Sequence, residues 1–169
     1  PFVITRAAYA GVQRYACVWT GDNVANWSHL RLALSMMLSL GLSGQPFSGS
    51  DIGGFIGTPS PELYARWIQL GEHRQTGLPI LRPLLLHYPN DARTHDVDDA
   101  FLLGRHLLVA PVLEAGARNR RVYFPEGQWY DFWTDQCYEG PTEVLIEAPL
   151  DLLPLFVQAG TVLPLGPVV

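Results

Sequence analysis

The fold of this chain is decided by residues 16–44, which read ACVWTGDNVANWSHLRLALSMMLSLGLSG. The stretch opens with a short strand-like run that ends on a turn formed by Gly21 and Asp22. Residues 26–44 then carry apolar side chains at helical spacing and end in glycines, where helices commonly stop. Strand, acid-bearing turn and helix in this order predict a β/α unit.

The flanking segments repeat this order. Residues 1–8, PFVITRAA, form a β-leaning run, and residues 45–55, QPFSGSDIGGF, form a short strand that closes on a second Asp-plus-glycine corner. Residues 60–71, SPELYARWIQLG, predict a helix, because Ser, Pro and Glu suit its first positions. The amino-terminal half is therefore expected to be an α/β structure.

The second half of the chain has a different texture. Short apolar runs rich in branched residues alternate with Pro and Gly turns from residue 81 to the end. This pattern predicts an antiparallel β-sandwich or a small barrel. By default we expect a structural role for this half, with core and interface positions for its aromatic residues Trp129, Tyr130, Phe132 and Trp133.

Composition excludes several classes of function. The formal net charge is −5, from 11 Lys and Arg against 16 Asp and Glu. No basic cluster is present, so we expect no nucleic-acid partner. Hydrophobic residues make up 48% of the chain, yet no apolar run is long enough to span a bilayer. A soluble globular protein without a membrane partner is expected.

The cysteines and the amino terminus say little about the compartment. Cys17 and Cys137 lie far apart and form no metal-ligand pattern, so we expect buried free thiols, with a single disulfide as the alternative. No secretory signal is present, but the chain begins at Pro1 in a run that reads like the middle of a longer sequence. The compartment stays unknown, with the cytoplasm slightly favoured.

One acidic segment raises the question of a metal. Residues 89–101, PNDARTHDVDDAF, contain four aspartates. A calcium site is one interpretation, but the spacing does not follow an EF-hand loop. A solvated loop is the preferred interpretation. With no other ligand cluster, and with neither a Walker-type loop nor a GxGxxG motif after a strand, we expect no metal, nucleotide or other cofactor.

Three polar residues follow successive predicted strands. Arg6 comes after FVIT, Asp22 after ACVWTG and Asp51 after PFSGS. In a β/α barrel the carboxyl ends of the strands carry the chemistry, so these side chains are expected to converge on one pocket. Each acid taken alone could be an ordinary turn or cap residue. Their occurrence in register on successive units favours a functional interpretation.

The neighbours of these residues suit a sugar. Aromatic side chains, which can cover the apolar faces of a sugar ring, stand nearby as Trp19, Trp27, Phe47 and Phe55. Carboxylates and Arg bind hydroxyl groups, and the glycines near Asp51 would let backbone approach a ligand. A carboxyl beside aromatic surface has its charged form disfavoured, which suits a general acid at Asp22.

Several longer motifs resemble one known family. WTGDN, FSGSDIGGF and SPELYARWIQLG are similar to segments of glycoside hydrolase family 31, the α-glucosidase and α-xylosidase family. LPILRPLLLHYPND, DDAFLLGRHLLVAPVLEAGA, VYFPEGQWYDFWT and LPLFVQAGTVLPLGP resemble its C-terminal region. The resemblance implies a partial (β/α)8 TIM barrel over residues 1–80. It also implies a C-terminal β-sandwich domain over residues 81–169, whose start includes the end of the barrel.

The resemblance also implies roles for single residues in a retaining glycosidase. Asp22 matches the general acid/base of the family, and Arg6 matches an arginine that contacts the substrate and the catalytic carboxylates. Asp51 matches an acid that holds sugar hydroxyls in the −1 subsite, with Trp19 and Phe55 as aromatic walls. The implied substrate is an oligosaccharide with a terminal α-glucosyl unit, because the DIGGF and SPELYARW segments look more like α-glucosidases than α-xylosidases.

The sequence departs from the family pattern in two places. The family nucleophile lies in a Trp-x-Asp-Met-Asn motif, which this chain does not contain. At the Gly71–Glu72 junction a segment with a sugar-binding His is missing, and His73 is expected to be a surface residue rather than its replacement. We therefore expect a fragment that is inactive alone and needs the rest of the polypeptide to complete the barrel. A non-catalytic carbohydrate-binding remnant is the alternative.

Overall fold

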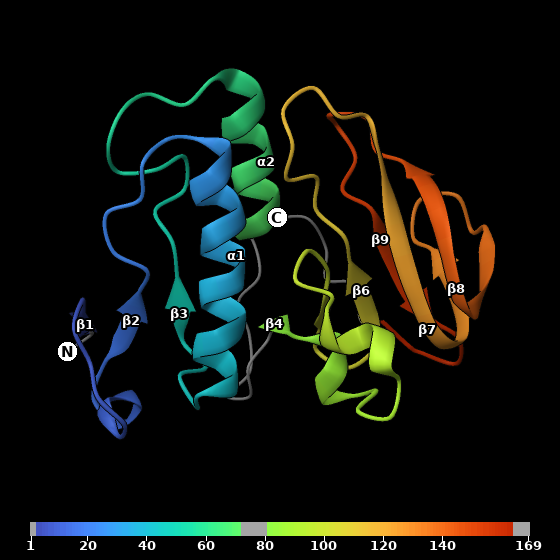
Figure 1. Cartoon of the computed structure of the whole chain (residues 1–169), viewed down its shortest axis with the longest axis horizontal. Helices are drawn as coiled ribbons and strands as arrows, with labels where there is room; N and C mark the ends of the chain where they lie inside the picture. The colour runs from blue at the N-terminus through green and yellow to red at the C-terminus, as the bar shows by residue number, and fades with distance from the viewer. Residues whose placement is uncertain (1–2, 72–80, 164–169) are drawn as a thin grey trace.

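A parallel sheet forms the amino-terminal part of the molecule. The computed structural model describes residues 3–71 and 81–163. The first strands are β1 (Ile4–Thr5), β2 (Cys17–Trp19) and β3 (Ser48–Gly49), with the short 3₁₀ helix η1 (Val12–Arg14) between the first two. Val18 pairs with Thr5 on one side and with Ser48 on the other, so β2 is the central strand. Both strand pairs are parallel, and the β2 and β3 arrows point the same way in Figure 1.

Two helices follow this sheet, α1 (Trp27–Leu42) after β2 and α2 (Pro61–Gly71) after β3. The side chain of Asn26 caps α1 by accepting a hydrogen bond from the His29 N–H at 2.8 Å. The Ser60 hydroxyl caps α2 by accepting a hydrogen bond from the Leu63 N–H at 3.2 Å. Such caps are worth about 1 kcal/mol each. Both predicted helices are confirmed, including the start of α2 at Pro61.

The second half folds into an antiparallel sheet of six strands in the order β4-β5-β6-β9-β7-β8. The strands are β4 (Leu81–Arg82), β5 (Phe101–Leu103), β6 (Leu107–Val109), β7 (Asn119–Asp131), β8 (Cys137–Glu147) and β9 (Leu155–Gln158). The 3₁₀ helices η2 (Leu84–Leu86) and η3 (Ala92–His95) lie between β4 and β5. Figure 1 shows the long β7–β8 hairpin on the side of the molecule away from β1.

This sheet separates two hydrophobic cores. Phe101 and Val109 are fully buried against the apolar residues of α1 and α2, including Trp67. Their neighbours Leu102 and Leu108 belong to the second core, which lies within the C-terminal part. The alternation follows from the two-residue period of a strand. Each large apolar side chain buried in this way contributes roughly 1.5–3 kcal/mol, and the first core joins the two helices to the sheet of the second half.

The aromatic residues of β7 are not all in the core. Trp129 is fully buried and its indole N–H donates to the Pro125 carbonyl at 2.9 Å. Tyr130 is 39% exposed and Trp133 is 49% exposed. Tyr130 follows an inward-facing residue of the same strand and therefore points outward. Of these three residues only Trp129 lies in the core, so the expected core position is confirmed for Trp129 alone.

The prediction for the cysteines is only partly right. Both thiols are free, as expected, but Cys17 is half-buried and Cys137 is exposed at the start of β8. The predicted domain boundary at residue 80 falls within residues 72–80, outside the described residues, and stays a prediction. Among the described helices, none is both long and apolar enough to cross a membrane.

Candidate active site

Three polar side chains lie where the parallel strands end. Arg6 follows β1 directly, Asp22 comes three residues after β2, and Asp51 comes two residues after β3. Because the strands are parallel, their carboxyl ends meet at one edge of the sheet (Figure 1). The structure therefore places all three residues at the predicted edge.

An ion pair brings two of them together. Arg6 Nη1 lies 3.2 Å from Asp22 Oδ2, and the Asp22 side chain is 31% exposed. The carboxylate is thus open to solvent on one side and faces a guanidinium on the other. The Asp51 carboxylate has no hydrogen-bond or ion-pair partner among the described residues. One carboxylate is held in place, whereas the other is available to a ligand.

Asn23, which sequence reasoning missed, joins the loops of Asp22 and Asp51. It is 3% exposed, and its amide donates to the Thr20 hydroxyl at 2.7 Å and to the Gly21 carbonyl at 3.2 Å. Its backbone carbonyl accepts hydrogen bonds from Phe55 N–H at 2.7 Å and from Ile56 N–H at 3.0 Å. The sequence signal for this role was an Asn directly after Gly-Asp, but the same order is typical of an ordinary turn.

The glycines after Asp51 serve packing within the chain. Both Gly53 and Gly54 have φ 88°, a conformation that favours glycine. A Cβ on Gly53 would lie 2.7 Å from the Tyr64 ring, and one on Gly54 would lie 2.7 Å from the Ala25 nitrogen. The expectation that these glycines admit a ligand is therefore corrected for both, since the close neighbours are parts of the protein.

The predicted aromatic residues do not form one group. Trp19 is half-buried at the end of β2, and Phe55 is 66% exposed beside the Asp51 loop, so both lie at the carboxyl edge. Phe47 precedes β3 and lies at the opposite end of that strand, contrary to expectation. Trp27 begins α1 and packs against the core of the helices. Trp19 and Phe55 remain candidates for a sugar-binding wall.

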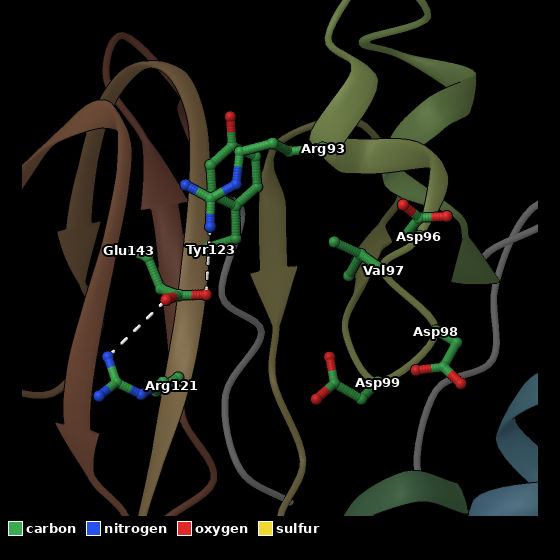
Figure 2. A pocket seen from close by; sticks show the side chains of 8 residues that line it. All are labelled: Arg93, Asp96, Val97, Asp98, Asp99, Arg121, Tyr123 and Glu143. Atoms are coloured by element: carbon green, nitrogen blue, oxygen red, sulfur yellow. Dashed lines mark hydrogen bonds and ion pairs between the residues drawn. The ribbon is translucent and has the colours of Figure 1, made fainter.

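The acidic segment lies elsewhere, on the C-terminal part. A pocket of about 360 Å³ has Asp96, Asp98 and Asp99 on one side and residues of β7 and β8 on the other (Figure 2). Arg31 of α1 lies 3.9 Å from Asp98, and Arg120 lies 2.9 Å from Asp99. Asp98 and Asp99 are thus each paired with an arginine.

The charged side chains on the opposite wall of this pocket also pair with one another. Glu143 lies between two guanidinium groups, 3.3 Å from Arg93 and 3.7 Å from Arg121. Arg93 also stacks over the ring of Tyr123, with 4.4 Å between guanidinium carbon and ring centroid (Figure 2). Among the described residues, no group of three or more His, Cys, Asp or Glu side chains is arranged to hold a metal ion. The segment is mostly exposed, as a solvated loop would be.

Two expectations fall on residues that the structure does not describe. The junction between Gly71 and Glu72 and the side chain of His73 lie at or within residues 72–80. The predicted surface position of His73 and the predicted missing segment at this junction therefore stay predictions.

Comparison with known proteins gives matches along the whole chain. The model of the glycosyl hydrolases family 31 TIM-barrel domain matches residues 1–75. The model of the family 31 C-terminal domain matches residues 77–163. These matches confirm the predicted fold class, the later part of a TIM barrel followed by a β-rich C-terminal domain.

Individual relatives agree with this result. Alpha-glucosidase 2 of Bacillus thermoamyloliquefaciens is 36% identical over 217 aligned positions, which cover 99% of this chain and 28% of that protein. The family 31 dextranase of Flavobacterium johnsoniae, solved with glucose, has a TM-score of 0.86 and 34% identity over 95% of this chain and 27% of its own. A family 31 alpha-xylosidase from a soil metagenome, solved with xylose, has a TM-score of 0.86 and 28% identity, with coverages of 95% and 35%.

The chain is short relative to these proteins. It spans about a quarter of the length of the curated relatives that it matches. The alignment of 217 positions also exceeds the 169 residues of this chain, so the relative carries internal residues that the chain lacks. Since models of one family match both of its halves, the chain belongs to glycosyl hydrolase family 31.

Proposed function

We propose that this chain is part of a retaining α-glycosidase, an α-glucosidase that releases terminal α-linked glucose from oligosaccharides. The observation that carries the proposal is the Arg6–Asp22 ion pair at the carboxyl edge of the barrel strands, with Asp51 following the adjacent strand. Active sites of TIM barrels occupy this edge. Carboxylates, an arginine and half-exposed aromatic residues are the groups that bind sugar hydroxyls and ring faces.

Asp22 is proposed as the general acid/base. In the first half of a retaining reaction it gives its proton to the glycosidic oxygen, and the C–O bond to the leaving group breaks as a nucleophile bonds to the sugar. In the second half Asp22 takes a proton from water, which then displaces the enzyme carboxylate. Arg6, at 3.2 Å, offsets the negative charge that Asp22 acquires when its proton leaves.

The remaining groups are proposed to bind the sugar in the −1 subsite. The Asp51 carboxylate has no partner among the described residues and can accept hydrogen bonds from hydroxyl groups. Phe55 is 66% exposed and offers a face to the ring, with Trp19 on the neighbouring strand. Glucose is the proposed sugar because alpha-glucosidases are among the relatives at 36% identity.

The nucleophile is proposed to come from the rest of a longer polypeptide. A retaining glycosidase needs a second carboxylate about 5–5.5 Å from the acid/base. We assign the role of nucleophile to none of the acids in the present chain. We therefore expect the purified 169-residue chain to be inactive. Hydrolysis of an aryl α-glucoside by that chain would contradict this part of the proposal.

Substrate choice is tested on the full-length polypeptide. We expect kcat/KM for 4-nitrophenyl α-glucoside to exceed that for the corresponding α-xyloside by about 10²-fold or more, because xylose lacks the hydroxymethyl group that a glucose pocket binds. The alpha-xylosidase among the similar structures supports the alternative. The reverse order of the two kcat/KM values would establish that alternative in place of ours.

A further inference from the structure

A second groove lies on the C-terminal part of the molecule. It has a volume of about 340 Å³ and runs between the turn that joins β7 to β8 and the loop at residues 149–154. This size lies within the range of roughly 300–1,000 Å³ that is common for small-molecule sites. None of its lining residues belongs to the loops of Arg6, Asp22 or Asp51. The groove is therefore separate from the candidate active site.

An exposed tryptophan dominates this groove. Trp133 is 49% exposed, although its indole N–H already donates to the Leu153 carbonyl at 2.8 Å. The edge-to-face contact with Phe132, at 4.9 Å between ring centroids, also restrains the ring. With its N–H satisfied, the indole offers the ligand apolar surface, and little conformational entropy is lost when something packs on it.

The backbone under the tryptophan is fixed as well. Asp131 is 9% exposed, and its Oδ1 accepts hydrogen bonds from Trp133 N–H at 2.8 Å and from Thr134 N–H at 3.0 Å. The backbone N–H of Asp131 also donates to the Gln136 carbonyl at 2.8 Å. The turn is thus held by hydrogen bonds on both sides, and the aromatic surface is organised before any ligand arrives.

Polar groups of the right kind surround this surface. The Gln136 amide and the Glu147 carboxylate line the groove, and neither makes a hydrogen bond or ion pair with the described residues. Together they supply donors and acceptors for hydroxyl groups. The groove has no Lys or Arg among its lining residues, whereas it contains Asp131 and Glu147. An anionic ligand such as a phosphate is therefore disfavoured.

We propose that this groove is a non-catalytic binding site for a neutral saccharide chain, with Trp133 as the platform for one sugar ring. A pyranose combines an apolar C–H face with a rim of hydroxyl groups, which matches an indole surface beside an unpaired amide and an unpaired carboxylate. Only the choice of α-linked glucose as the sugar rests on the proposed function. Bound here, an oligosaccharide or glucan would stay near the enzyme between catalytic events.

The test measures binding of maltotriose to the 169-residue chain by calorimetry and by ¹H–¹⁵N NMR. We expect Trp133→Ala to weaken binding by about tenfold or more, and Trp133→Phe to restore part of it, because an aromatic face remains. The matched control is Tyr15→Ala, at an aromatic residue that is 73% exposed, precedes β2 and does not line this groove. This variant should leave the Kd within about twofold. The indole signal of Trp133 should shift on titration.

Three results would overturn the inference. They are an unchanged Kd in Trp133→Ala, an equal loss of binding in Tyr15→Ala and Trp133→Ala, and no binding of maltotriose at all. Gln136→Ala, which alters an exposed side chain, replaces Trp133→Ala if the latter fails to fold, and should also weaken binding. The proposed function can fail without this inference. A full-length protein that hydrolyses no α-glucoside but still binds maltotriose through Trp133 would contradict the proposed function and support this inference.

Discussion

Asn23 orders its own turn through its buried side chain and joins the Asp51 loop through its backbone carbonyl. We expect Asn23→Ala to lower the free energy of unfolding by about 1–3 kcal/mol, because the part-buried Thr20 and Gly21 oxygens lose their amide donor. Urea denaturation of the purified chain measures this change. The control is Asn90→Ala at an exposed position, which should change stability by less than about 0.5 kcal/mol. Equal effects in the two variants would contradict the role of Asn23.

Tyr123 gives the C-terminal part a pH-dependent contribution to stability. Burial, and then the hydrogen bond to Asp91, raises the pKa of the Tyr123 phenol to about 12. The neutral phenol is thus stabilised in the folded state. Its contribution is complete below the ordinary value of about 10 and is lost as the pH rises through about 12.

Tyr123→Phe should therefore lower the free energy of unfolding by about 0.5–1.5 kcal/mol at neutral pH. The difference between the two proteins should stay constant up to about pH 10 and shrink between about pH 10 and 12. Denaturation at a series of pH values checks this. Tyr9→Phe, at a tyrosine that is 76% exposed, should show no such trend. A difference that grows with pH would contradict the assignment.

At the scale of the elements, the close approach of two loops depends on Gly54. Gly54→Ala would place a Cβ 2.7 Å from the Ala25 nitrogen and 2.8 Å from its Cα, on a backbone at φ 88°. Gly57 has the same φ, but its nearest neighbour would lie at 3.8 Å. Gly57→Ala thus carries the cost of the backbone conformation alone, about 1–2 kcal/mol.

We expect Gly54→Ala to destabilise the chain by at least about 1 kcal/mol more than Gly57→Ala, because backbone must move to relieve the contact. Thermal unfolding of the two variants side by side measures the difference. If both variants lose the same stability, the packing of the two loops does not depend on this glycine.

Elements set by local chemistry could be predicted from the sequence. Helices α1 and α2 lie where caps and periodicity place them, and Arg6, Asp22 and Asp51 follow their strands as expected. Errors arose where a neighbour distant in sequence decides the environment. Gly53 and Gly54 were assigned to a ligand, because nothing in the local sequence shows that Tyr64 and Ala25 come so close. Phe47 was misplaced because β3 has only two residues and begins after it.

At the scale of the whole molecule, α2 connects the two halves. Arg66, fully buried, donates to the Ala148 carbonyl at 2.8 Å and to the Leu152 carbonyl at 3.3 Å. Burial lowers the pKa of its guanidinium. On the same helix, Trp67 donates to the Ser50 hydroxyl, next to Asp51, at 3.0 Å. The position of the C-terminal part is thereby linked to the loop of the candidate active site.

Replacing Arg66 should show how much more a buried contact between the halves contributes to stability than an exposed one. We expect Arg66→Met to destabilise the chain by about 2–5 kcal/mol, because the buried Ala148 carbonyl and the part-buried Leu152 carbonyl lose their donor. Arg118 also bridges to α2 through Glu62, but its side chain is 49% exposed. Arg118→Gln should cost about 0–1 kcal/mol. Chemical denaturation measures the free energy of unfolding of both variants. Similar losses of stability would show that Arg66 links the halves no more strongly than an exposed contact does.

This link could not be predicted from the sequence. Arg66 stands in a helix whose pattern reads as amphipathic, and the two carbonyl groups that it binds in the C-terminal part lie more than eighty residues away. The same limit applies to the candidate active site, since the relative carries residues within the aligned region that this chain does not. Local patterns identify the acid-bearing turns, whereas in our proposal the complete pocket depends on residues outside this chain.

The most direct test of the account concerns Asp22 in the full-length polypeptide. The measurement is kcat/KM of Asp22→Asn for aryl α-glucosides with leaving groups of different pKa. A general acid matters most when the leaving group needs a proton. We therefore predict losses of about 10²–10⁴-fold for poor leaving groups and much smaller losses for activated ones such as dinitrophenyl glucoside. Equal losses across the whole series would contradict the assignment of Asp22 as the acid/base.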